Sequence, residues 1–345
     1  MAAPRLFRLR SEVAVAPSGP VAERLPIARV RVDTGVFHLD QLYDYAVPEK
    51  LSALVLPGVR VQLPFGNRET EGIVVTRVAS PEKAGTLKPI TKVLSEHCVA
   101  TPASLTLIDK AAEFYCCNPW DIVRSAIPPR VASVDKELSV SRVISQSKIG
   151  NKVSAFQSFR PFIASDQQIT EIIDGFIKSG SVLIVAPDEK DVDRLISTLS
   201  DKFQHVLRLS SSSTREERYR NFLLSMRLQS SIVVGTRSAV FTPVNNLIAI
   251  IVYKESSPDH FDLRSPGWNT STIARMRAEL EGVGLVFTGF TPSVRVAHDI
   301  DRSDIKFNNQ KTQVNVQAFT PSDGSLLPGR IYSEIKKALK KGPVL

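Results

Sequence analysis

The sequence is poor in cysteine, with only Cys98, Cys116 and Cys117 among its 345 residues. Adjacent cysteines cannot easily close a disulfide, and no Cys-x-x-Cys pair is present. The pattern excludes a disulfide framework and a zinc site, so we expect no bound metal and reduced thiols in a cytoplasmic protein. Long apolar runs are also missing: the segment 247–252 is far too short to span a bilayer, which argues against a membrane protein.

The N-terminal segment lacks the apolar stretch of a signal peptide. Residues 1–26 carry four arginines and no continuous apolar run followed by a cleavage site. We expect this segment to be a flexible basic arm.

A phosphate-binding loop is a further absence, since neither Gly-Lys-Ser nor Gly-Lys-Thr occurs anywhere in the chain. P-loop NTPases need this sequence because its backbone amides hold the phosphates, its lysine reaches the β and γ oxygens and its hydroxyl holds magnesium. The sequence therefore predicts that ATP is not a cofactor of this chain.

Charge and size describe what is present. Lys and Arg number 44 against 35 Asp and Glu, a formal net charge of +9. Such a surplus favours an anionic partner, with nucleic acid ahead of a membrane surface, although proteins that bind neither can carry it. The length predicts about two domains, each large enough to bury its own core.

The first half of the chain has the alternation of a small antiparallel sheet or barrel. Apolar and polar residues alternate in 28–32, 59–63 and 72–76, so one face of each strand is buried. The other face would carry Arg29, Arg31, Arg60 and Arg68, either as a phosphate-binding surface or as an ordinary solvated face. Thr101-Pro102 predicts the start of a helix that packs on the sheet.

From Ser165 onward the chain alternates between helices and strands. Ser165-Asp166-Gln167-Gln168 has the pattern of a capping box before an amphipathic helix. Buried strands are expected at 181–186, 205–209, 231–234 and 247–252, with helices at 188–203 and 214–229 between them. This order predicts a doubly wound parallel sheet, which would bind ligands at the carboxyl ends of its strands.

Two short runs near the start suggest a nucleotide site. In Tyr43-Asp44-Tyr45 an acid stands between two aromatic residues, and Leu63-Pro64-Phe65-Gly66 ends a predicted strand. A carboxylate can accept hydrogen bonds from a base or sugar while rings stack, and Gly66 lets a ligand approach the backbone. The alternative is an ordinary hairpin with two strand tyrosines.

The stretch 28–128 also resembles the N-terminal domain of the PriA family of bacterial replication-restart proteins. The resemblance lies in Leu42 to Pro48, Pro57 to Gly66, Gly72 to Val75, Leu87 to Ile90 and Tyr115 to Trp120, in order and at the family's spacing. It implies a domain that captures the 3′ end of a nascent strand at an arrested fork. The implied pocket residues are Tyr43, Asp44, Tyr45, Gly66 and Lys88, the last as a cation beside the phosphate.

Two later segments resemble the helicase lobe of the same family. Residues 231–243 contain the Gly-Thr-Arg-Ser-Ala motif, which implies that Thr236, Arg237 and Ser238 lie near the DNA backbone. The alternative is a strand-to-helix turn in which Arg237 pairs with an acid. Thr291-Pro292-Ser293 resembles the end of a second motif, with Phe290 replacing its alanine.

The metal-binding motif of active relatives is replaced. Where the resemblance implies Asp-Glu-Glu-His, this chain has Tyr253-Lys254-Glu255-Ser256, so a phenol and an ammonium replace two acids. A hard cation prefers oxygen anions, and one remaining acid is not enough. The resemblance thus implies a degenerate RecA-like lobe.

The resemblance gives the expected domain organisation. We expect the basic arm at 1–26, a β-barrel-like 3′-end DNA-binding domain at 27–129, a linker at 130–160 and one RecA-like helicase lobe at 161–345. The linker is too short for the winged helix that the family carries there. The zinc-binding cysteines and second lobe are also missing, and the chain would end at the start of that lobe.

Three functional hypotheses follow. The first is a monomeric, non-enzymatic protein that binds stalled forks and single-stranded DNA and promotes primosome assembly and reloading of the replicative helicase. The second is an ATP-dependent 3′-to-5′ helicase with diverged motifs. The third is a protein-interaction platform whose DNA contact is incidental.

Overall fold

A computed structural model describes residues 19–83, 85–138, 153–308 and 328–340. The expected basic arm at 1–26 thus lies mostly outside the described residues. Residues up to 310 form one compact unit, and residues from 311 form a second. The described part of the second unit, residues 328–340, contains helix α9 (Gly329–Leu339).

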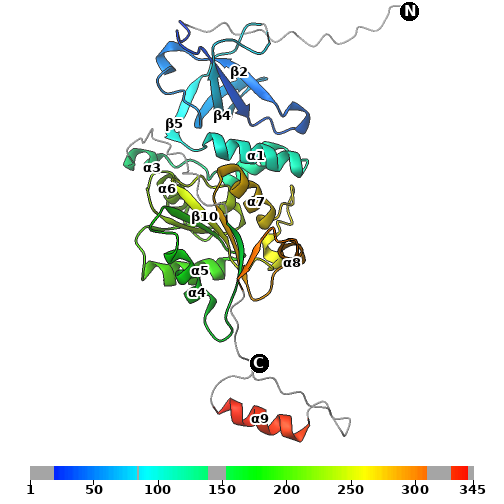
Figure 1. Cartoon of the computed structure of the whole chain (residues 1–345). Coiled ribbons are helices and arrows are strands. Elements are labelled where there is room, and N and C mark those ends of the chain that lie inside the picture. Colours follow the sequence, from blue (N-terminus) through cyan, green and yellow to red (C-terminus); the bar gives the residue numbers. More distant parts are fainter. Residues whose placement is uncertain (1–18, 84, 139–152, 309–327, 341–345) are drawn as a thin grey trace, which may run out of the picture. The chain divides into compact units, whose positions relative to one another are not determined.

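An antiparallel sheet of five strands begins the first unit, in the order β2-β1-β4-β3-β5. Backbone hydrogen bonds from Ala46 N to Lys88 O (2.9 Å) and from Ile90 N to Ala46 O (3.0 Å) connect β2 to the segment just before β5, and the sheet curves into a small barrel (Figure 1). Apolar side chains of alternate positions fill it, Val30, Val61 and Leu63 among them. The strands are β1 (Ile27–Val32), β2 (Leu42–Ala46), β3 (Val59–Phe65), β4 (Arg68–Val78) and β5 (Lys92–Cys98).

Three helices follow the barrel: α1 (Pro102–Phe114), α2 (Pro119–Ala126) and α3 (Ala132–Glu137). The predicted cap of α1 is confirmed, since Thr101 and Ser104 bond reciprocally in a capping box. Their apolar faces belong to one hydrophobic cluster that also contains residues of the parallel sheet, such as Leu183 and Val252. The helices α1, α2 and α3, here called the barrel-side helices, therefore share a hydrophobic core with the lobe.

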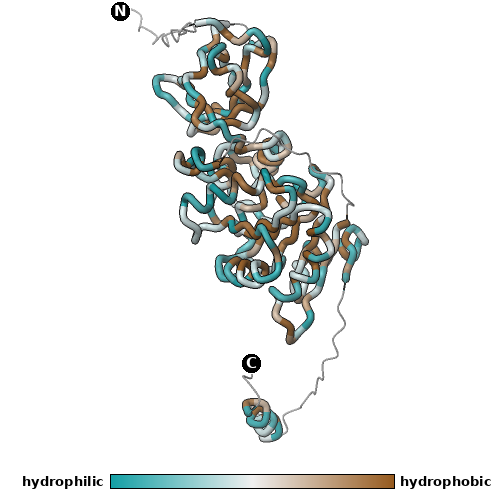
Figure 2. Tube along the Cα trace, turned by 90° about the vertical axis from the view of Figure 1, so that its left-hand side faces the viewer, coloured by the Kyte–Doolittle hydropathy of each residue, from teal (hydrophilic) through white to brown (hydrophobic). Residues whose placement is uncertain are grey.

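The lobe is a parallel sheet of seven strands in the order β12-β6-β11-β10-β7-β9-β8. Alternate residues of β7 point to opposite faces: Val182 and Ile184 pack with α4 and α5, whereas Leu183 and Val185 pack with α6 and α7. Figure 2 shows the hydrophobic segments concentrated inside this lobe and inside the barrel. The prediction of a barrel-like domain followed by a doubly wound α/β lobe is confirmed.

The bounds of the lobe elements are β6 (Ser154–Ser158), α4 (Ser165–Asp174), β7 (Ser181–Val185), α5 (Glu189–Ser200), β8 (Val206–Leu209), α6 (Arg215–Ser225), β9 (Ile232–Gly235), β10 (Leu247–Val252), α7 (Thr270–Glu281), β11 (Gly284–Gly289), α8 (Val294–Asp301) and β12 (Lys306–Asn308). Short 3-10 helices are η1 (Phe37–Leu39), η2 (Glu49–Leu51), η3 (Arg237–Phe241) and η4 (Pro258–His260).

Two local predictions were wrong. The interval 130–160 was expected to be a linker, but it contains α3 and strand β6, which pairs with β11 in the lobe sheet; residues 139–152 lie outside the described residues. The capping box at Ser165 does not form, because Ala164 is the cap residue and no side chain caps the helix. Ser165 instead bonds with the Tyr253 hydroxyl, at 2.5 Å.

Candidate nucleic-acid interface

The five pocket residues implied by the resemblance all line one cavity of the barrel domain, here called the barrel cavity. Its volume is about 540 Å³. Tyr43, Asp44 and Tyr45 come from β2, Gly66 from the β3–β4 turn and Lys88 from the segment before β5. The structure thus brings together side chains from three separate parts of the chain.

Both tyrosines line this cavity, but the ring of each one is packed against other parts of the barrel. Tyr45 is 4% exposed, and its hydroxyl donates to Pro64 O at 3.2 Å. The Tyr43 ring packs edge-on against Phe65 with centroids 5.0 Å apart, while its hydroxyl donates to Leu39 O at 2.8 Å. The Tyr45 ring therefore belongs to the core of the barrel, whereas the Tyr43 ring is partly exposed beside Phe65.

Asp44 projects to the opposite side of β2 from the tyrosines. Its carboxylate accepts hydrogen bonds from Arg29 Nε at 3.3 Å and from the Glu82 backbone N–H at 2.7 Å. The side chain is only 11% exposed. The acid is therefore held in a fixed position at the edge of the cavity.

Gly66 has a φ of +58°, and a Cβ built there would meet no atom within 4 Å. The turn geometry thus favours glycine at this position, and the space beside its backbone is open. Lys88 is half-buried, and its backbone carbonyl accepts from Ala46 N. Six further residues complete the lining. Pro64, Phe65 and Leu87 belong to runs that the sequence analysis singled out, whereas sequence reasoning missed Leu39, Gln41 and Thr86.

The expected row of solvated arginines on the barrel was partly wrong. Arg31 is 7% exposed and pairs with Asp40 and Asp109, at 3.1 and 2.6 Å. Arg60 is 5% exposed and donates to Pro128 O at 2.6 Å. Both side chains connect the sheet to other parts of the unit, because this face of the barrel is covered by helices.

Thr236, Arg237 and Ser238 lie together at the carboxyl end of β9, where η3 begins. All three are half-buried, and Arg237 donates to the backbone carbonyl of Asp259 at 2.7 Å, an acceptor other than a carboxylate. Gly235 allows this turn, since a Cβ there would lie 2.3 Å from Leu209 O. Trp268 from the nearby loop is 1% exposed and packs on Phe241, so its ring belongs to the core.

Three aromatic rings lie together at the carboxyl ends of β6, β10 and β11: those of Phe159, Tyr253 and Phe290. Phe159, which follows β6, lies 5.7 Å from the Tyr253 ring and 5.6 Å from the Phe290 ring. Burial raises the pKa of Tyr253 to about 12, so its phenol stays neutral. The loop at 159–164 follows β6, a strand that sequence reasoning missed, and a phosphate-binding loop of a RecA-like lobe follows a strand in the same way.

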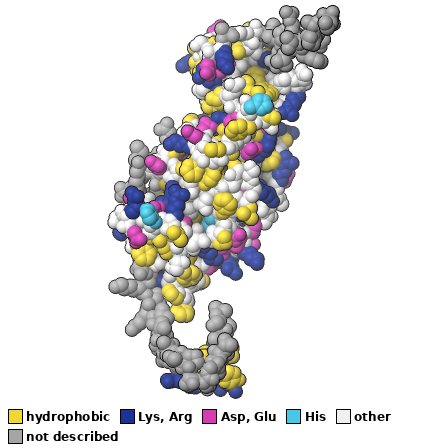
Figure 3. Space-filling model, turned by 90° about the vertical axis from the view of Figure 1, so that its right-hand side faces the viewer, with side chains coloured by type: hydrophobic (Ala, Val, Ile, Leu, Met, Phe, Trp, Pro, Cys, Tyr) yellow, Lys and Arg dark blue, Asp and Glu magenta, His cyan; other side chains and the backbone are white. Residues whose placement is uncertain are grey.

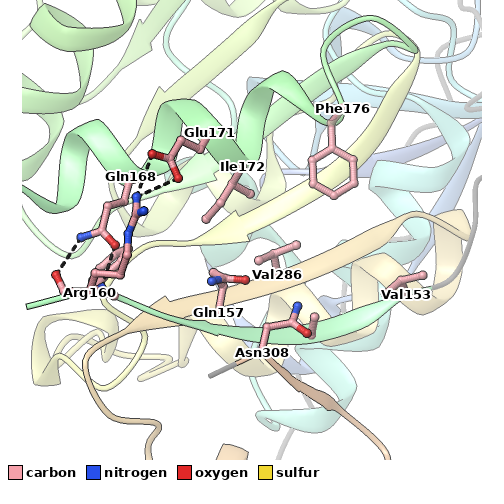
Figure 4. Close-up of a pocket in the computed structure, with 11 residues that line it drawn as sticks. Val153, Gln157, Arg160, Gln168, Glu171, Ile172, Phe176, Val286 and Asn308 are labelled. Atoms are coloured by element: carbon pink, nitrogen blue, oxygen red, sulfur yellow. Dashed lines mark hydrogen bonds and ion pairs between the residues drawn. The ribbon is translucent and has the colours of Figure 1, made fainter. Parts of the chain in front are cut away.

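Side chains of α4 fasten this loop. Figure 4 shows the Arg160 guanidinium beside Glu171, with Gln168 bonded to the Arg160 backbone. Arg160 Nη2 donates to both Glu171 oxygens at 2.7 and 2.8 Å, and Gln168, 5% exposed, accepts from Arg160 N and donates to Arg160 O. Together with apolar side chains such as Ile172 and Phe176 they line a cavity of about 360 Å³.

The remaining residues of the replaced motif are also engaged. Lys254 pairs with the buried Asp191 at 2.6 Å. Glu255 is 6% exposed and accepts from the Ser271 and Ser293 hydroxyls and from Ser293 N–H, at 2.8–3.1 Å. Within the described ranges no group of three or more His, Cys, Asp or Glu side chains is arranged to hold a metal ion.

Positive charge is spread over both parts of the unit. On the face drawn in Figure 3, Lys and Arg side chains are scattered over the barrel and the lobe, with hydrophobic side chains between them. Among the described helices, none is long and apolar enough to cross a membrane.

Comparison with known proteins gives matches over most of the chain. Residues 29–128 match the family model described as the PriA 3′ DNA-binding domain (3′BD). The probable replication restart protein PriA of Mycobacterium tuberculosis is 28% identical over 82% of this chain and 47% of its own length, and that of Mycobacterium leprae is 29% identical over 77% and 45%. The chain therefore spans about half the length of these curated relatives.

One further relative matches over a shorter stretch. The PriA of Synechocystis is 31% identical over 36% of this chain and 15% of its own length. Among solved structures, the C-terminal domain of Saccharomyces cerevisiae Dbp5 aligns over 55% of this chain and 97% of its own, with 12% identity and a TM-score of 0.36, too low a score to carry an argument.

Proposed function

We propose that this PriA-like chain acts in replication restart by binding the 3′ end of a nascent DNA strand at an abandoned fork. The observation that carries the proposal is the barrel cavity, which collects Tyr43, Asp44, Tyr45, Gly66 and Lys88 from three separate segments. In this proposal Asp44 accepts hydrogen bonds from the terminal nucleotide, and Lys88 lies on the side of its phosphate. The half-buried turn at Arg237 contributes backbone contacts.

The binding test compares forks that carry a free 3′-hydroxyl with forks that carry a 3′-phosphate on the leading strand. We expect wild-type protein to prefer the free hydroxyl, and Asp44→Ala and Lys88→Glu to weaken that preference about tenfold. Asp201→Ala and Lys178→Glu are matched controls on the lobe, because both side chains are exposed there. Equal affinity of all variants for both forks would remove the barrel cavity from the proposal.

The same proposal assigns no ATP hydrolysis to this chain. Aromatic rings of Phe159, Tyr253 and Phe290, together with the fastened loop at Arg160, occupy the edge where a nucleotide would lie. Purified protein with fork DNA is expected to show no turnover of ATP above background. Hydrolysis that is lost in Glu255→Gln would favour the helicase alternative instead.

A contact with other primosome proteins, including a replicative helicase, has its own supporting observation. Phe162 is 92%, Phe290 59% and Val294 89% exposed, and they follow β6 and β11, which are adjacent strands. Exposed apolar side chains that gather in one place are typical of protein-interaction surfaces. Nuclease-treated pull-downs with Phe162→Asp test this contact, and unchanged capture would contradict it.

A further inference from the structure

The 3-10 helix η1 separates two cavities. Leu39 and Gln41 line the barrel cavity, while Gly35 and Phe37 line a second cavity of about 260 Å³. The second one, here called the junction cavity, is completed by the corner between α1 and α2 and by Ser265 and Pro266 of the lobe. A segment of seven residues, 35–41, therefore borders both.

Hydrogen bonds hold η1 in place at both ends. At its start, Thr34 Oγ1 donates to Val36 O at 3.0 Å, and the Arg68 guanidinium donates to Thr34 O at 3.2 Å. At its end, Leu39 O accepts from the Tyr43 hydroxyl, and Asp40 pairs with the buried Arg31. The turn is thus a preorganised element, tied to a residue of the barrel cavity through Tyr43.

The turn presents an aromatic ring to solvent. Phe37 is 65% exposed and belongs to none of the hydrophobic clusters of the described core, so its ring is available to a ligand. Phe37 and Leu39 are two residues apart in a 3-10 helix. At a rise of about 2.0 Å per residue they lie about 4 Å apart along its axis, close to one base-stacking step of about 3.4 Å. A base next to a nucleotide bound in the barrel cavity would therefore come over this ring.

The junction cavity has groups suited to a base more than to a phosphate. Asp121 lines it, and its carboxylate would repel a phosphate but can accept a hydrogen bond from a base amino group. Arg124 is paired with Asp33 and Asp121, at 2.7 and 3.3 Å, so its charge is largely compensated. The Tyr115 hydroxyl accepts from Asn269 N–H at 3.0 Å and ties the α1–α2 corner to the lobe.

We propose that Phe37 is a stacking platform for the nucleotide next to the 3′ terminus, and that the strand continues past it into the junction cavity. This inference rests on the proposed function, since it assumes that the barrel cavity holds the terminal nucleotide. It makes the binding site at least two nucleotides long. It also assigns single-stranded DNA, rather than a free mononucleotide, as the ligand.

The test uses the full chain and single strands that carry 2-aminopurine at the first, second or third position from the 3′ end. Binding should quench the fluorescence at the second position, and Phe37→Ala should abolish that quenching. The variant should also weaken affinity about five- to a hundredfold, the range found when one stacked base loses its aromatic partner. Phe37→Trp should retain both properties, whereas Phe37→Leu should not, because it keeps the apolar surface without the ring.

Tyr332→Ala is the matched control, because Tyr332 is an exposed aromatic residue of α9 and its loss should leave quenching and affinity unchanged. Wild-type behaviour of Phe37→Ala, or quenching at the first position only, would overturn the platform. If the free 3′-hydroxyl is still preferred in that case, the proposed function stands and this inference alone fails. If wild-type protein does not distinguish a free 3′-hydroxyl from a 3′-phosphate, both fail.

Discussion

At the scale of single residues, Tyr253 and Lys254 contribute to the structure of the lobe. Lys254 pairs with Asp191, which is 4% exposed, and Tyr253 bonds with Ser165. Breaking a buried ion pair on one side leaves an uncompensated charge, which costs more than the pair contributes. Lys254 therefore stabilises the folded lobe by compensating the charge of Asp191.

We expect Lys254→Met to lower the free energy of unfolding by about 2 kcal/mol, because Asp191 would keep its buried charge without its nearest cation. Urea unfolding measures this change. The double variant Lys254→Met/Asp191→Asn should recover most of the loss, since the uncompensated charge is gone. Lys190→Met, at an exposed position of α5, should cost less than about 0.5 kcal/mol; a similar loss there would contradict the explanation.

Two glycines of the barrel, Gly58 and Gly66, have a positive φ but differ in the space that a side chain would have. Gly58 has a φ of +85°, and a Cβ there would lie 2.1 Å from Ala100 O, whereas Gly66 faces open space. Gly66→Ala should cost about 1 kcal/mol from its backbone alone, and Gly58→Ala several times more because backbone must move. Thermal unfolding of the two variants compares these costs.

The Gly66→Ala variant also tests ligand binding. If a ligand approaches the Gly66 backbone, this variant should bind a 3′ end about tenfold more weakly, and unchanged binding would exclude that approach.

At the scale of elements, α5 is connected to the strand beside it through one acid. Burial raises the pKa of Glu189, but hydrogen bonds from Ser211, Ser210 and Ser212 lower it by more than burial raises it. The resulting pKa is about 2. Ser211 N–H and the Ser211 hydroxyl donate to it at 2.8 and 2.6 Å. The carboxylate thus fastens the start of α5 to the loop after β8.

This pKa predicts how stability depends on pH. A carboxyl group whose pKa is lower in the folded state stabilises the protein above its ordinary pKa near 4.5, and that contribution is lost as pH falls towards 2. Glu189→Gln should therefore be less stable than wild type by about 1 kcal/mol at neutral pH, allowing for solvent screening of a partly exposed group, with a gap that closes below pH 4. The exposed Glu113→Gln should show no such gap in denaturant titrations at several pH values.

Most of the elements could be predicted from periodicity, and the failures have physical causes. Alternation in 28–32 shows which face of a strand is buried, but it cannot show that a helix covers the other face, so Arg31 and Arg60 were expected in solvent. Strand β6 reads Ser-Ala-Phe-Gln-Ser, which has only two apolar residues. At the candidate site, the sequence motifs pointed to residues that line the barrel cavity. The 3-10 helix η1 has no sequence pattern of its own, and the position of Phe37 is set by tertiary contacts of the turn, such as those of Tyr43 and Arg31.

At the scale of the whole described unit, barrel-side helices and lobe share one hydrophobic cluster. Further bonds join them: the Tyr219 hydroxyl of α6 donates to Asp135 of α3 at 2.8 Å, and Arg220 of α6 pairs with Glu137 of α3 at 2.7 Å. The unit should therefore unfold as one, although its sequence suggests two domains.

Trp268→Phe tests this cooperativity, because Trp120 of α2 then remains as the only tryptophan. Its fluorescence reports on the barrel-side helices, while circular dichroism reports mainly on the more numerous helices of the lobe. We expect coincident unfolding midpoints and a loss of about 1–2 kcal/mol, since the smaller ring leaves space beside Phe241. Two separated midpoints would show that the parts unfold independently.

The aromatic rings at the end of β6, β10 and β11 have a kinetic consequence. Under the proposed function, Phe159, Tyr253 and Phe290 lie where a motor protein would bind ATP, so ATP would not drive release of this chain from DNA. The lifetime of its complex with DNA would then be governed by ionic strength and by competing strands, and adding ATP should leave the off-rate unchanged.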